Sequence, residues 1–292
     1  FRSYLSKACA SLKIPILGSL PAIPELRWPE RHLGLQPGVE QKLPEPDQLA
    51  ELAEKYLDLK LLIKTFPALF ASAAPAKNLQ STIPKFSKRI AVAQDESFHF
   101  YYVANLEWLR EQGAEVITFS PLHDSQVPKN VDGLILGGGF PEVFAEEMSA
   151  NRSMLISLKQ AVESGMPCYA ECGGLMLLTD SLKVHSGKCY SMAGVVPGTV
   201  EMTKQLQNFG YCKIDLPKSG EVRGHEFHYS RWSEETKSAN LWEVIRHSTG
   251  VSRREGYRTS NLHASYVHLY FPQAATFIRE ILHLSLLEPD KC

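Results

Sequence analysis

One cysteine lies at a point where a strand-like run passes directly into a helix-like run. The hexapeptide YAECGG spans 169–174, with the apolar stretch 166–170 leading into it and the stretch 173–179 following the cysteine. Such a corner strains the backbone of a nucleophile, and small neighbouring residues permit the tight turn. The N–H groups and the dipole of the following helix favour thiolate over thiol. We therefore identify Cys172 as the candidate nucleophile and the N–H of Gly173 as a candidate oxyanion donor.

A tri-glycine loop supplies candidates for a second oxyanion donor. Residues 137–139 are all glycine and follow the apolar strand-like run 131–136. Because neighbouring parallel strands end at the same edge of a sheet, this loop and the Cys172 corner are expected to lie together. Three glycines alone are explained equally well by a plain tight turn. Beside a cysteine corner, they favour an oxyanion or substrate-binding role for Gly138 and Gly139.

A thiolate mechanism also needs a base. The best candidate is His268, near the carboxyl end of the strand-like run ASYVHLYF at 264–271. Most of the ten histidines are expected to be ordinary core or surface residues. The late strand-end position, where His268 could meet Cys172, distinguishes it from the others.

The segment RGHEFHYS at 223–230 is a second polar cluster. On a strand, His225 and His228 point to opposite faces, whereas Glu226 shares a face with His228. No third ligand is evident, so a metal site is not favoured, and we expect no bound metal. We interpret the segment as a polar strand facing the substrate, with Glu226 and His228 as candidate binding residues.

The elements around these residues alternate between strand and helix. Strands are predicted at 90–93, 115–119, 131–136 and 166–170, and helices at 100–112, 141–149, 151–164 and 173–179. Short loops between such elements are typical of an α/β fold with a doubly wound, mostly parallel sheet covered on both faces. Further strands are predicted at 193–201, 208–216, 222–229 and 264–271, and a closing helix at 273–287.

The first part of the chain has a different pattern. A buried strand is predicted at 13–18, and six prolines within 19–47 exclude a long helix there. Asp47 is the expected N-cap of an amphipathic helix over 48–64, whose apolar residues recur with a period near 3.6. The Ala-, Ser- and Pro-rich stretch 65–88 is the best candidate for a linker.

Composition excludes several classes of protein. The 292 residues carry 31 basic and 32 acidic side chains, a balance that argues against binding nucleic acid through bulk charge. No apolar run is long enough for a membrane-spanning helix, so no membrane partner is expected. The six cysteines are sparse and irregularly spaced, without a CxxC pair. This usage is typical of a protein of the reducing cytoplasm.

Several long segments together resemble one family. They are AVAQDESFHFYYVANLEWL, DGLILGGGFPEVFAEEMSANRSM, YAECGGLMLL, RGHEFHYS and ASYVHLYF, with IPILGSLPAIPELRWPERHLGL nearer the start. In this order they resemble the cobyrinate a,c-diamide synthases, ATP-dependent amidotransferases of cobalamin biosynthesis. The resemblance implies a flavodoxin-like, class I glutamine amidotransferase-like domain over 88–292. It further implies a helix and linker over 47–87, and the end of a P-loop-type ATP domain over 1–46.

The resemblance also implies roles. Cys172 matches the nucleophile that releases ammonia from L-glutamine, and His268 matches the histidine that activates it. Gly139 and Gly173 fall where oxyanion donors are expected. Ammonia would then amidate the a and c carboxylates of a corrinoid held by the ATP-using domain, with ATP and Mg²⁺ as cofactors of the full-length enzyme and none in the glutaminase domain. A homodimer is also compatible with the sequence.

Two departures from related patterns stand out. The phosphate-binding loop of an ATP domain is absent, so the chain is expected to be a C-terminal portion that binds ATP poorly on its own. Many glutaminases of this fold place Glu two residues after the catalytic His, but here that position is Tyr270. A Cys–His dyad is therefore expected, with His268 oriented by a backbone carbonyl or by Glu226.

Alternative functions stay open on the sequence alone. Relatives acting on hydrogenobyrinate or nickel-sirohydrochlorin differ mainly in the acceptor. A DJ-1-like or peptidase-like cysteine hydrolase shares the sheet and the cysteine corner but does not explain RGHEFHYS. A decayed, non-catalytic module is disfavoured by the intact Cys172, Gly173 and His268. The stretch FHFYYVAN at 98–105 faces either a cleft or domain interface, or the aromatic core.

Overall fold

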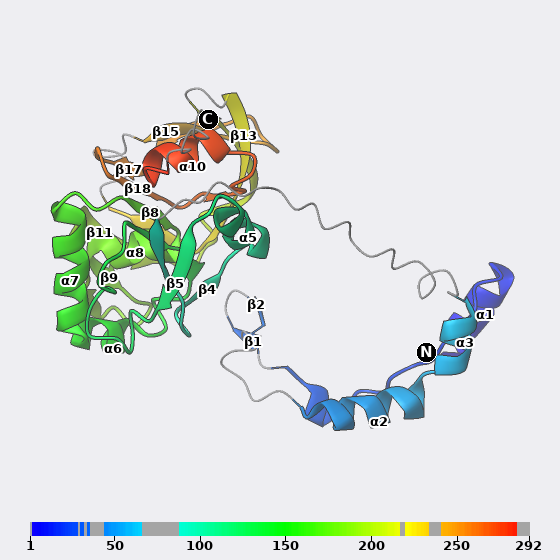
Figure 1. The fold of residues 1–292 in the computed structure, drawn as a ribbon. Helices are drawn as coiled ribbons and strands as arrows, with labels where there is room; N and C mark the ends of the chain where they lie inside the picture. The colour runs from blue at the N-terminus through cyan, green and yellow to red at the C-terminus, as the bar shows by residue number, and fades with distance from the viewer. Residues whose placement is uncertain are drawn as a thin grey trace, which may run out of the picture. The chain divides into compact units, whose positions relative to one another are not determined.

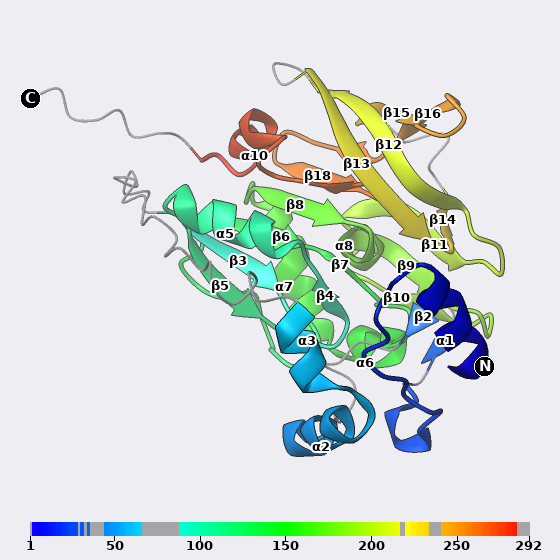
Figure 2. The same ribbon diagram turned by 90° about the vertical axis from the view of Figure 1, so that its right-hand side faces the viewer.

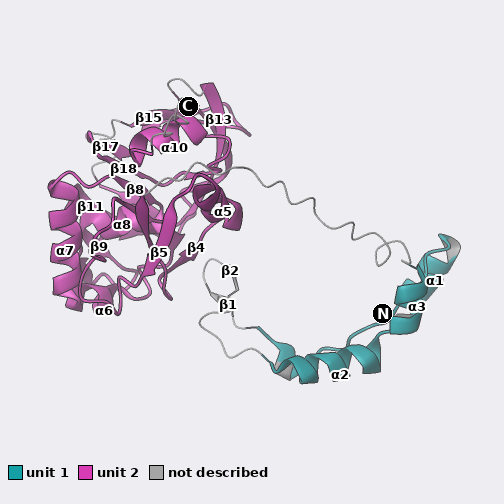
Figure 3. Ribbon diagram, in the orientation of Figure 1, with its two compact units in different colours: residues 1–80 teal, residues 81–292 magenta. Residues whose placement is uncertain are grey.

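The computed structural model describes residues 2–28, 30–31, 34–35, 44–65, 88–216, 220–233 and 241–284. The chain divides into two compact units, residues 1–80 and 81–292, coloured separately in Figure 3. The domain boundaries expected at 46/47 and 87/88 stay predictions. The linker predicted at 65–88 lies almost wholly outside the described residues.

The first unit is small and mostly helical in its described part. Its elements are α1 (Arg2–Ser11), the short 3-10 helix η1 (Pro24–Leu26), β1 (Glu30–Arg31), β2 (Gly34–Leu35), α2 (Pro46–Tyr56) and α3 (Leu59–Thr65). The helix predicted over 48–64 is interrupted at Leu57, which forms an isolated bridge with Gly18. A second helix, α3, begins just after Asp58, whose side chain accepts the N–H of Leu61 at 2.9 Å.

The buried strand predicted at 13–18 is wrong. Residues 14–17 form no strand, and only Gly18 makes a single bridge. Ile14 is 54% exposed, and Ile16 and Leu17 are only half-buried, so no residue of the run is buried. A strand needs a neighbour along its length, and Pro15 also lacks the N–H that a ladder requires.

A six-stranded sheet organises the second unit (Figures 1 and 2). Its order is β17-β18-β8-β6-β3-β5, and every pair is parallel except β17 with β18. The strands are β3 (Arg89–Ala93), β5 (Glu115–Phe119), β6 (Gly133–Leu136), β8 (Cys168–Glu171), β17 (Tyr257–Arg258) and β18 (Leu262–Ser265). Numbering the parallel strands along the chain gives the order 2-1-3-4-5, which confirms the flavodoxin-like doubly wound sheet.

Helices cover both faces of this sheet. They are α5 (Val103–Glu111), α6 (Ala145–Ala150), α7 (Arg152–Glu163), α8 (Gly173–Leu178) and α10 (Ala275–Ile281). Alternate residues of β3 separate into two cores: Ala91 and Ala93 pack with α6, α7 and α8, while Ile90 and Val92 pack with α5 and α10. This alternation is the period of two that a strand buried on both faces imposes.

Three further sheets complete the second unit, and all their strand pairs are antiparallel except β11 with β9, which is parallel. Five strands follow the order β16-β15-β12-β13-β19, four follow β10-β9-β11-β14, and β4 pairs with β7. Their bounds are β4 (Phe98–Phe100), β7 (Gly138–Gly139), β9 (Thr179–Lys183), β10 (Cys189–Ser191), β11 (Val196–Met202), β12 (Asn208–Leu216), β13 (Gly220–His228), β14 (Ser230–Trp232), β15 (Trp242–Arg246), β16 (Ser252–Glu255) and β19 (His268–Leu269).

Two predicted elements of the second unit need correction. The single strand predicted at 264–271 is two strands in different sheets, because the chain leaves the parallel sheet after Ser265 and joins β13 at His268. The predicted helix 141–149 begins only at Ala145, after a turn. Among the described residues, no helix is both long and apolar enough to cross a membrane.

Candidate active site

Cys172 occupies a strained corner between β8 and α8. Its φ of 48° and ψ of −101° are unfavourable for a residue with a side chain. The corner is held by backbone hydrogen bonds, since the N–H of Cys172 donates to Ser265 O at 2.7 Å and the N–H of Gly174 donates to Gly137 O at 2.9 Å. The backbone therefore stores strain at the candidate nucleophile, as the sequence predicts.

His268 lies between the cysteine and a carboxylate. Its Nδ1 is 3.2 Å from Glu171 Oε2, and the ring lies close enough to Cys172 for the cysteine to raise the pKa of the imidazole. Glu171 immediately precedes the nucleophile in the chain, and both it and His268 are buried. His268 thus interacts with both Cys172 and Glu171, as expected of a base between a nucleophile and an orienting acid.

The electrostatics of this arrangement favour a charged imidazole. Burial alone would lower the pKa of His268, but hydrogen bonds to Cys172 and Glu171, and the negative charges of both, raise the pKa to about 10. The physical meaning is that an imidazolium is stable between two acidic groups. Such a ring stabilises the thiolate that a nucleophilic mechanism requires.

Glu171 is the functional candidate that the sequence reasoning missed. Its Oε1 accepts the backbone N–H of Leu269 at 2.9 Å and the hydroxyl of Tyr169. The carboxylate therefore fixes the histidine ring and the backbone beside it. A glutamate at the end of a wholly buried strand, next to the nucleophile, was the available signal, because an ionised carboxylate is rarely buried without partners.

Asn105 fixes the segment that carries the base. Its side-chain amide donates to Leu269 O and accepts from the N–H of Phe271, both at 2.8 Å. Asn105 is buried on α5, so the two bonds clamp the backbone on either side of Tyr270. The stretch 98–105 accordingly contributes both to the core and to the surroundings of the active site.

The glycine loop lies against the histidine and the start of α8. A side chain at Gly138 would place its Cβ 2.6 Å from Cε1 of His268, and one at Gly173 would place it 3.2 Å from the N of Gly139. The structure therefore brings Gly138, Gly139 and Gly173 together beside the candidate nucleophile and base. The absence of side chains is what permits this approach.

Tyr101 ties this loop to the central sheet. Its hydroxyl accepts the N–H of Gly137 at 2.9 Å and donates to Ala93 O at the end of β3. Burial raises the pKa of this phenol, so the hydroxyl stays protonated and can make both bonds. A Cβ at Gly137 would lie 2.3 Å from the tyrosine ring, which shows how closely the ring packs on the loop.

The structure does not bring Glu226 and His228 to the cysteine. Both lie on the buried face of β13, as their spacing predicts. Glu226 pairs with Arg253, with a second contact at 3.3 Å, rather than orienting His268. His228 stacks on Tyr266 with ring centroids 3.8 Å apart, and burial lowers its pKa to about 3. Their part in substrate binding stays a prediction.

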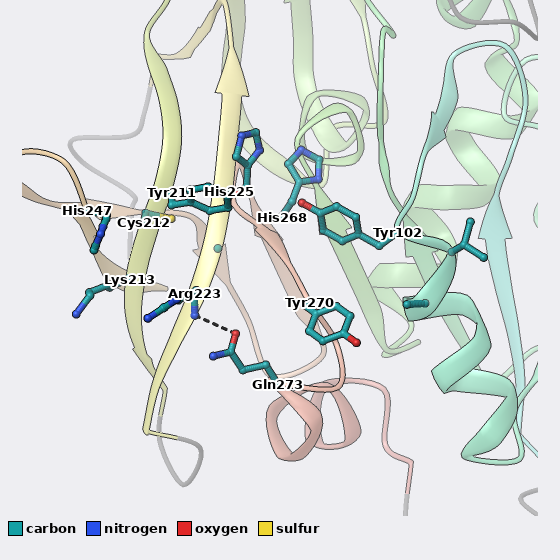
Figure 4. A pocket seen from close by; sticks show the side chains of 13 residues that line it. Tyr102, Tyr211, Cys212, Lys213, Arg223, His225, His247, His268, Tyr270 and Gln273 are labelled. Atoms are coloured by element: carbon teal, nitrogen blue, oxygen red, sulfur yellow. Dashed lines mark hydrogen bonds between the residues drawn. The ribbon is translucent and has the colours of Figure 1, made fainter. Parts of the chain in front are cut away.

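An open cleft of about 660 Å³ reaches His268 from the side of the five-stranded sheet. In Figure 4 the side chains of Tyr102, His225 and His268 gather at one end of it, while Lys213 and Arg223 lie toward the other. His268 is among the residues that line this cleft, and Cys172 is not. Within the described ranges, no cluster of three or more metal-ligating side chains is present.

Comparison with known proteins gives consistent matches. Residues 89–276 match the family described as the CobB/CobQ-like glutamine amidotransferase domain. Cobyrinate a,c-diamide synthase of Caldanaerobacter subterraneus subsp. tengcongensis is 42% identical over 267 residues, covering 88% of this chain and 58% of that protein. The protein of the same name from Listeria innocua is 40% identical over 281 residues, covering 92% of this chain and 61% of that protein.

The chain spans about three fifths of the length of these curated relatives. A solved structure titled as a glutamine amidotransferase aligns with 66% of this chain and 98% of its own, at 15% identity and a TM-score of 0.49.

Proposed function

The chain belongs to the CobB/CobQ-like glutamine amidotransferase family, and from this premise we propose that it releases ammonia from glutamine through Cys172, His268 and Glu171. The observation that carries the proposal is the imidazole of His268, which bridges a cysteine at a strained corner and a buried carboxylate. A glutaminase needs this set of groups, and the family description favours it over the peptidase-like alternative.

The first half-reaction forms a thioester. The Cys172 thiolate attacks the side-chain amide carbon of glutamine, and the backbone N–H groups of Gly139 and Gly173 are the proposed donors to the resulting oxyanion. As the C–N bond breaks, the His268 imidazolium gives its proton to the leaving nitrogen, which departs as ammonia. A glutamyl thioester and a neutral imidazole remain.

The second half-reaction restores the enzyme. Neutral His268 removes a proton from water, whose oxygen attacks the thioester carbon. The C–S bond then breaks, glutamate leaves, and the thiolate–imidazolium pair re-forms. Throughout both halves Glu171 holds Nδ1 of the ring and favours its charged form, so the same tautomer faces the sulfur at each step.

The ammonia acceptor is proposed from the relatives. Both relatives described above are named cobyrinate a,c-diamide synthase, so we propose that the intact enzyme uses the ammonia to amidate the a and c carboxylates of cobyrinate. Activation of a carboxylate would draw on ATP and Mg²⁺. Among the described residues, no group of three or more His, Cys, Asp or Glu side chains could hold a metal ion. A cytoplasmic location and a homodimer stay predictions.

The test measures glutamate and ammonia release from glutamine. Cys172→Ala is expected to abolish turnover, and an electrophilic glutamine analogue is expected to label Cys172 alone. Cys189→Ala is the matched control, because Cys189 is an exposed cysteine on β10. In the intact enzyme, amidation driven by added ammonia should survive Cys172→Ala. Glutamine turnover that persists without the Cys172 thiol would remove the proposed nucleophile.

A further inference from the structure

The chain passes twice between the five-stranded sheet and the central sheet. On the first passage, β16 ends at Glu255 in the five-stranded sheet and β17 follows in the central one, after Gly256. Gly256 has a φ of 79°, a conformation that favours glycine, so this passage is a tight turn. On the return passage, the chain leaves β18 at Ser265 and enters β19 of the five-stranded sheet at His268.

One carboxylate joins the two passages. Glu255 accepts the hydroxyl of Ser265 on Oε2 and the N–H of Tyr266 on Oε1, both at 2.7 Å. The hydroxyl oxygen of Ser265 in turn accepts the N–H of Val267 at 2.9 Å. The last residue of β16 therefore holds three consecutive residues of the return passage.

This segment, residues 265–267, connects the candidate nucleophile to the candidate base. Ser265 O accepts the N–H of Cys172 at 2.7 Å, and Ser265 lies opposite Glu171 in the register of the central sheet. His268 follows directly after the segment, as the first residue of β19. A displacement of the segment would therefore move the imidazole relative to the sulfur.

Glu255 is a costly residue for the interior of a fold. It is 1% exposed, and its three donors are neutral: a hydroxyl, a backbone N–H and the indole N–H of Trp242 at 2.9 Å. Burial raises the pKa of this carboxyl to about 7, although the hydrogen bonds from Ser265 and Tyr266 lower it. Because an apolar side chain would avoid this burial cost, stability alone does not account for a carboxylate here. Three donors that converge on two oxygens instead indicate a group that fixes geometry.

We propose that Glu255 is a positioning residue for glutamine hydrolysis, which holds segment 265–267 so that the imidazole of His268 stays beside the sulfur of Cys172. The inference rests on the proposed function and deepens it, because it names a residue that acts on the nucleophile and the base through the backbone between them. Glu255 does not act on glutamine itself. Its loss should therefore lower kcat and leave the KM for glutamine nearly unchanged.

Glu255→Gln, made in the full chain, tests this role. The side chain keeps its size, but whichever way the amide turns, its NH₂ group faces a donor that the carboxylate accepts. The kcat for glutamine hydrolysis should fall by about tenfold or more, since a misplacement of about 1 Å can cost about 10²-fold, and KM should change less than about threefold. The rate at which iodoacetamide alkylates Cys172, followed by mass spectrometry at neutral pH, should fall with kcat, because a displaced His268 stabilises the thiolate less.

Ser265→Ala is a second variant that reaches the same link from its other end. It keeps the backbone carbonyl that binds Cys172 but removes the hydroxyl between Glu255 and Val267. It should also lower kcat by about tenfold with little change in KM, and it decides the matter if Glu255→Gln does not fold. In the double variant the two losses should not multiply, because both substitutions break one link. Losses that multiply would count against the proposal.

Asp132→Asn is the matched control. Asp132 accepts the N–H of Arg89 at 2.8 Å, just before β6 and at the start of β3, so it also joins two parts of the chain through a carboxylate. It lies at the amino-terminal edge of the central sheet, opposite the edge that carries Cys172. Its loss should lower Tm but change kcat by less than about twofold. An unchanged kcat in Glu255→Gln and Ser265→Ala, or an equal loss of kcat in Asp132→Asn, would overturn the proposal.

Failure of this inference is distinguishable from failure of the proposed function. If Cys172→Ala abolishes glutamine turnover while Glu255→Gln and Ser265→Ala leave kcat unchanged, the glutaminase assignment stands and the role of Glu255 is refuted. If turnover survives Cys172→Ala, the proposed function fails. The alkylation rate of Cys172 still reports on the position of His268 in that case, and an unchanged rate in Glu255→Gln would refute the positioning role as well.

Discussion

Replacing Glu171 by glutamine tests the third member of the proposed triad. The substitution keeps the size of the side chain and can still accept the N–H of Leu269, but it removes the negative charge facing Nδ1 of His268. A hydrogen bond to a charged partner contributes about 1.5–3 kcal/mol, which corresponds to a loss of about tenfold to 150-fold in kcat/KM. If the amide also selects the wrong ring tautomer, the loss approaches about 10⁴-fold.

The pH profile of glutamine hydrolysis distinguishes this role from a structural one. In the native protein Glu171 and Cys172 raise the pKa of His268 to about 10, so the imidazolium persists well above neutral pH. Removing one of these charges lowers that pKa, because the folded protein then stabilises the charged ring less. The basic limb of the kcat/KM profile should therefore move to lower pH in Glu171→Gln.

A matched variant removes a contact of Glu171 while leaving its charge. Tyr169→Phe deletes only the hydroxyl that donates to Oε1 of the same carboxylate, and its loss in kcat/KM should stay below about tenfold. An unshifted basic limb in Glu171→Gln, together with less than a threefold change in rate, would refute the reasoning.

Three further outcomes follow from contacts in the structure. Tyr101→Phe leaves the N–H of Gly137 without its acceptor and should lower kcat by about tenfold, with little change in KM for glutamine. This loss is smaller than the roughly 10²–10³-fold loss in kcat expected when an oxyanion donor itself is removed. Gly138→Ala pushes a Cβ to 2.6 Å from the His268 ring and should cost about 10²-fold or more in glutamine turnover, while thermal unfolding checks that the fold persists. His263→Phe removes a buried imidazole whose two ring nitrogens have no hydrogen-bond partner among the described residues. Because the cost of burying these nitrogens is removed, the fold should gain about 1 kcal/mol, and Tm should rise by about 2–4 °C in a calorimetric scan. A lowered Tm would contradict the argument.

The central sheet could be predicted because its signals are local. Each parallel strand is a short apolar run between turn residues, and β3 buries alternate residues on two faces. The proximity of Cys172, the glycine loop and His268 follows from the shared carboxyl edge of such a sheet. These arguments need only the order of the elements along the chain.

What orients His268 could not be predicted in the same way. Because Tyr270 stands where related enzymes have Glu, the sequence left a backbone carbonyl or Glu226 as the group expected to orient His268. The actual partner is set by a change of sheet: the chain leaves β18 at Ser265, which pairs with Glu171, and crosses over the end of β8 before joining β13. A run of eight mostly apolar residues contains no signal for that crossing, because each half is a good strand by itself.

The crossing also places the proposed nucleophile and the proposed base on different sheets. The sulfur is anchored to the parallel sheet, whereas the imidazole travels with the antiparallel one, paired to His225. The thiol and the imidazole are therefore held by two different sheets, and the packing of these sheets sets the distance between the two groups. Because a hydrogen bond weakens steeply with distance and angle, the pairing of His268 with His225 helps to set the geometry of the proposed glutaminase site.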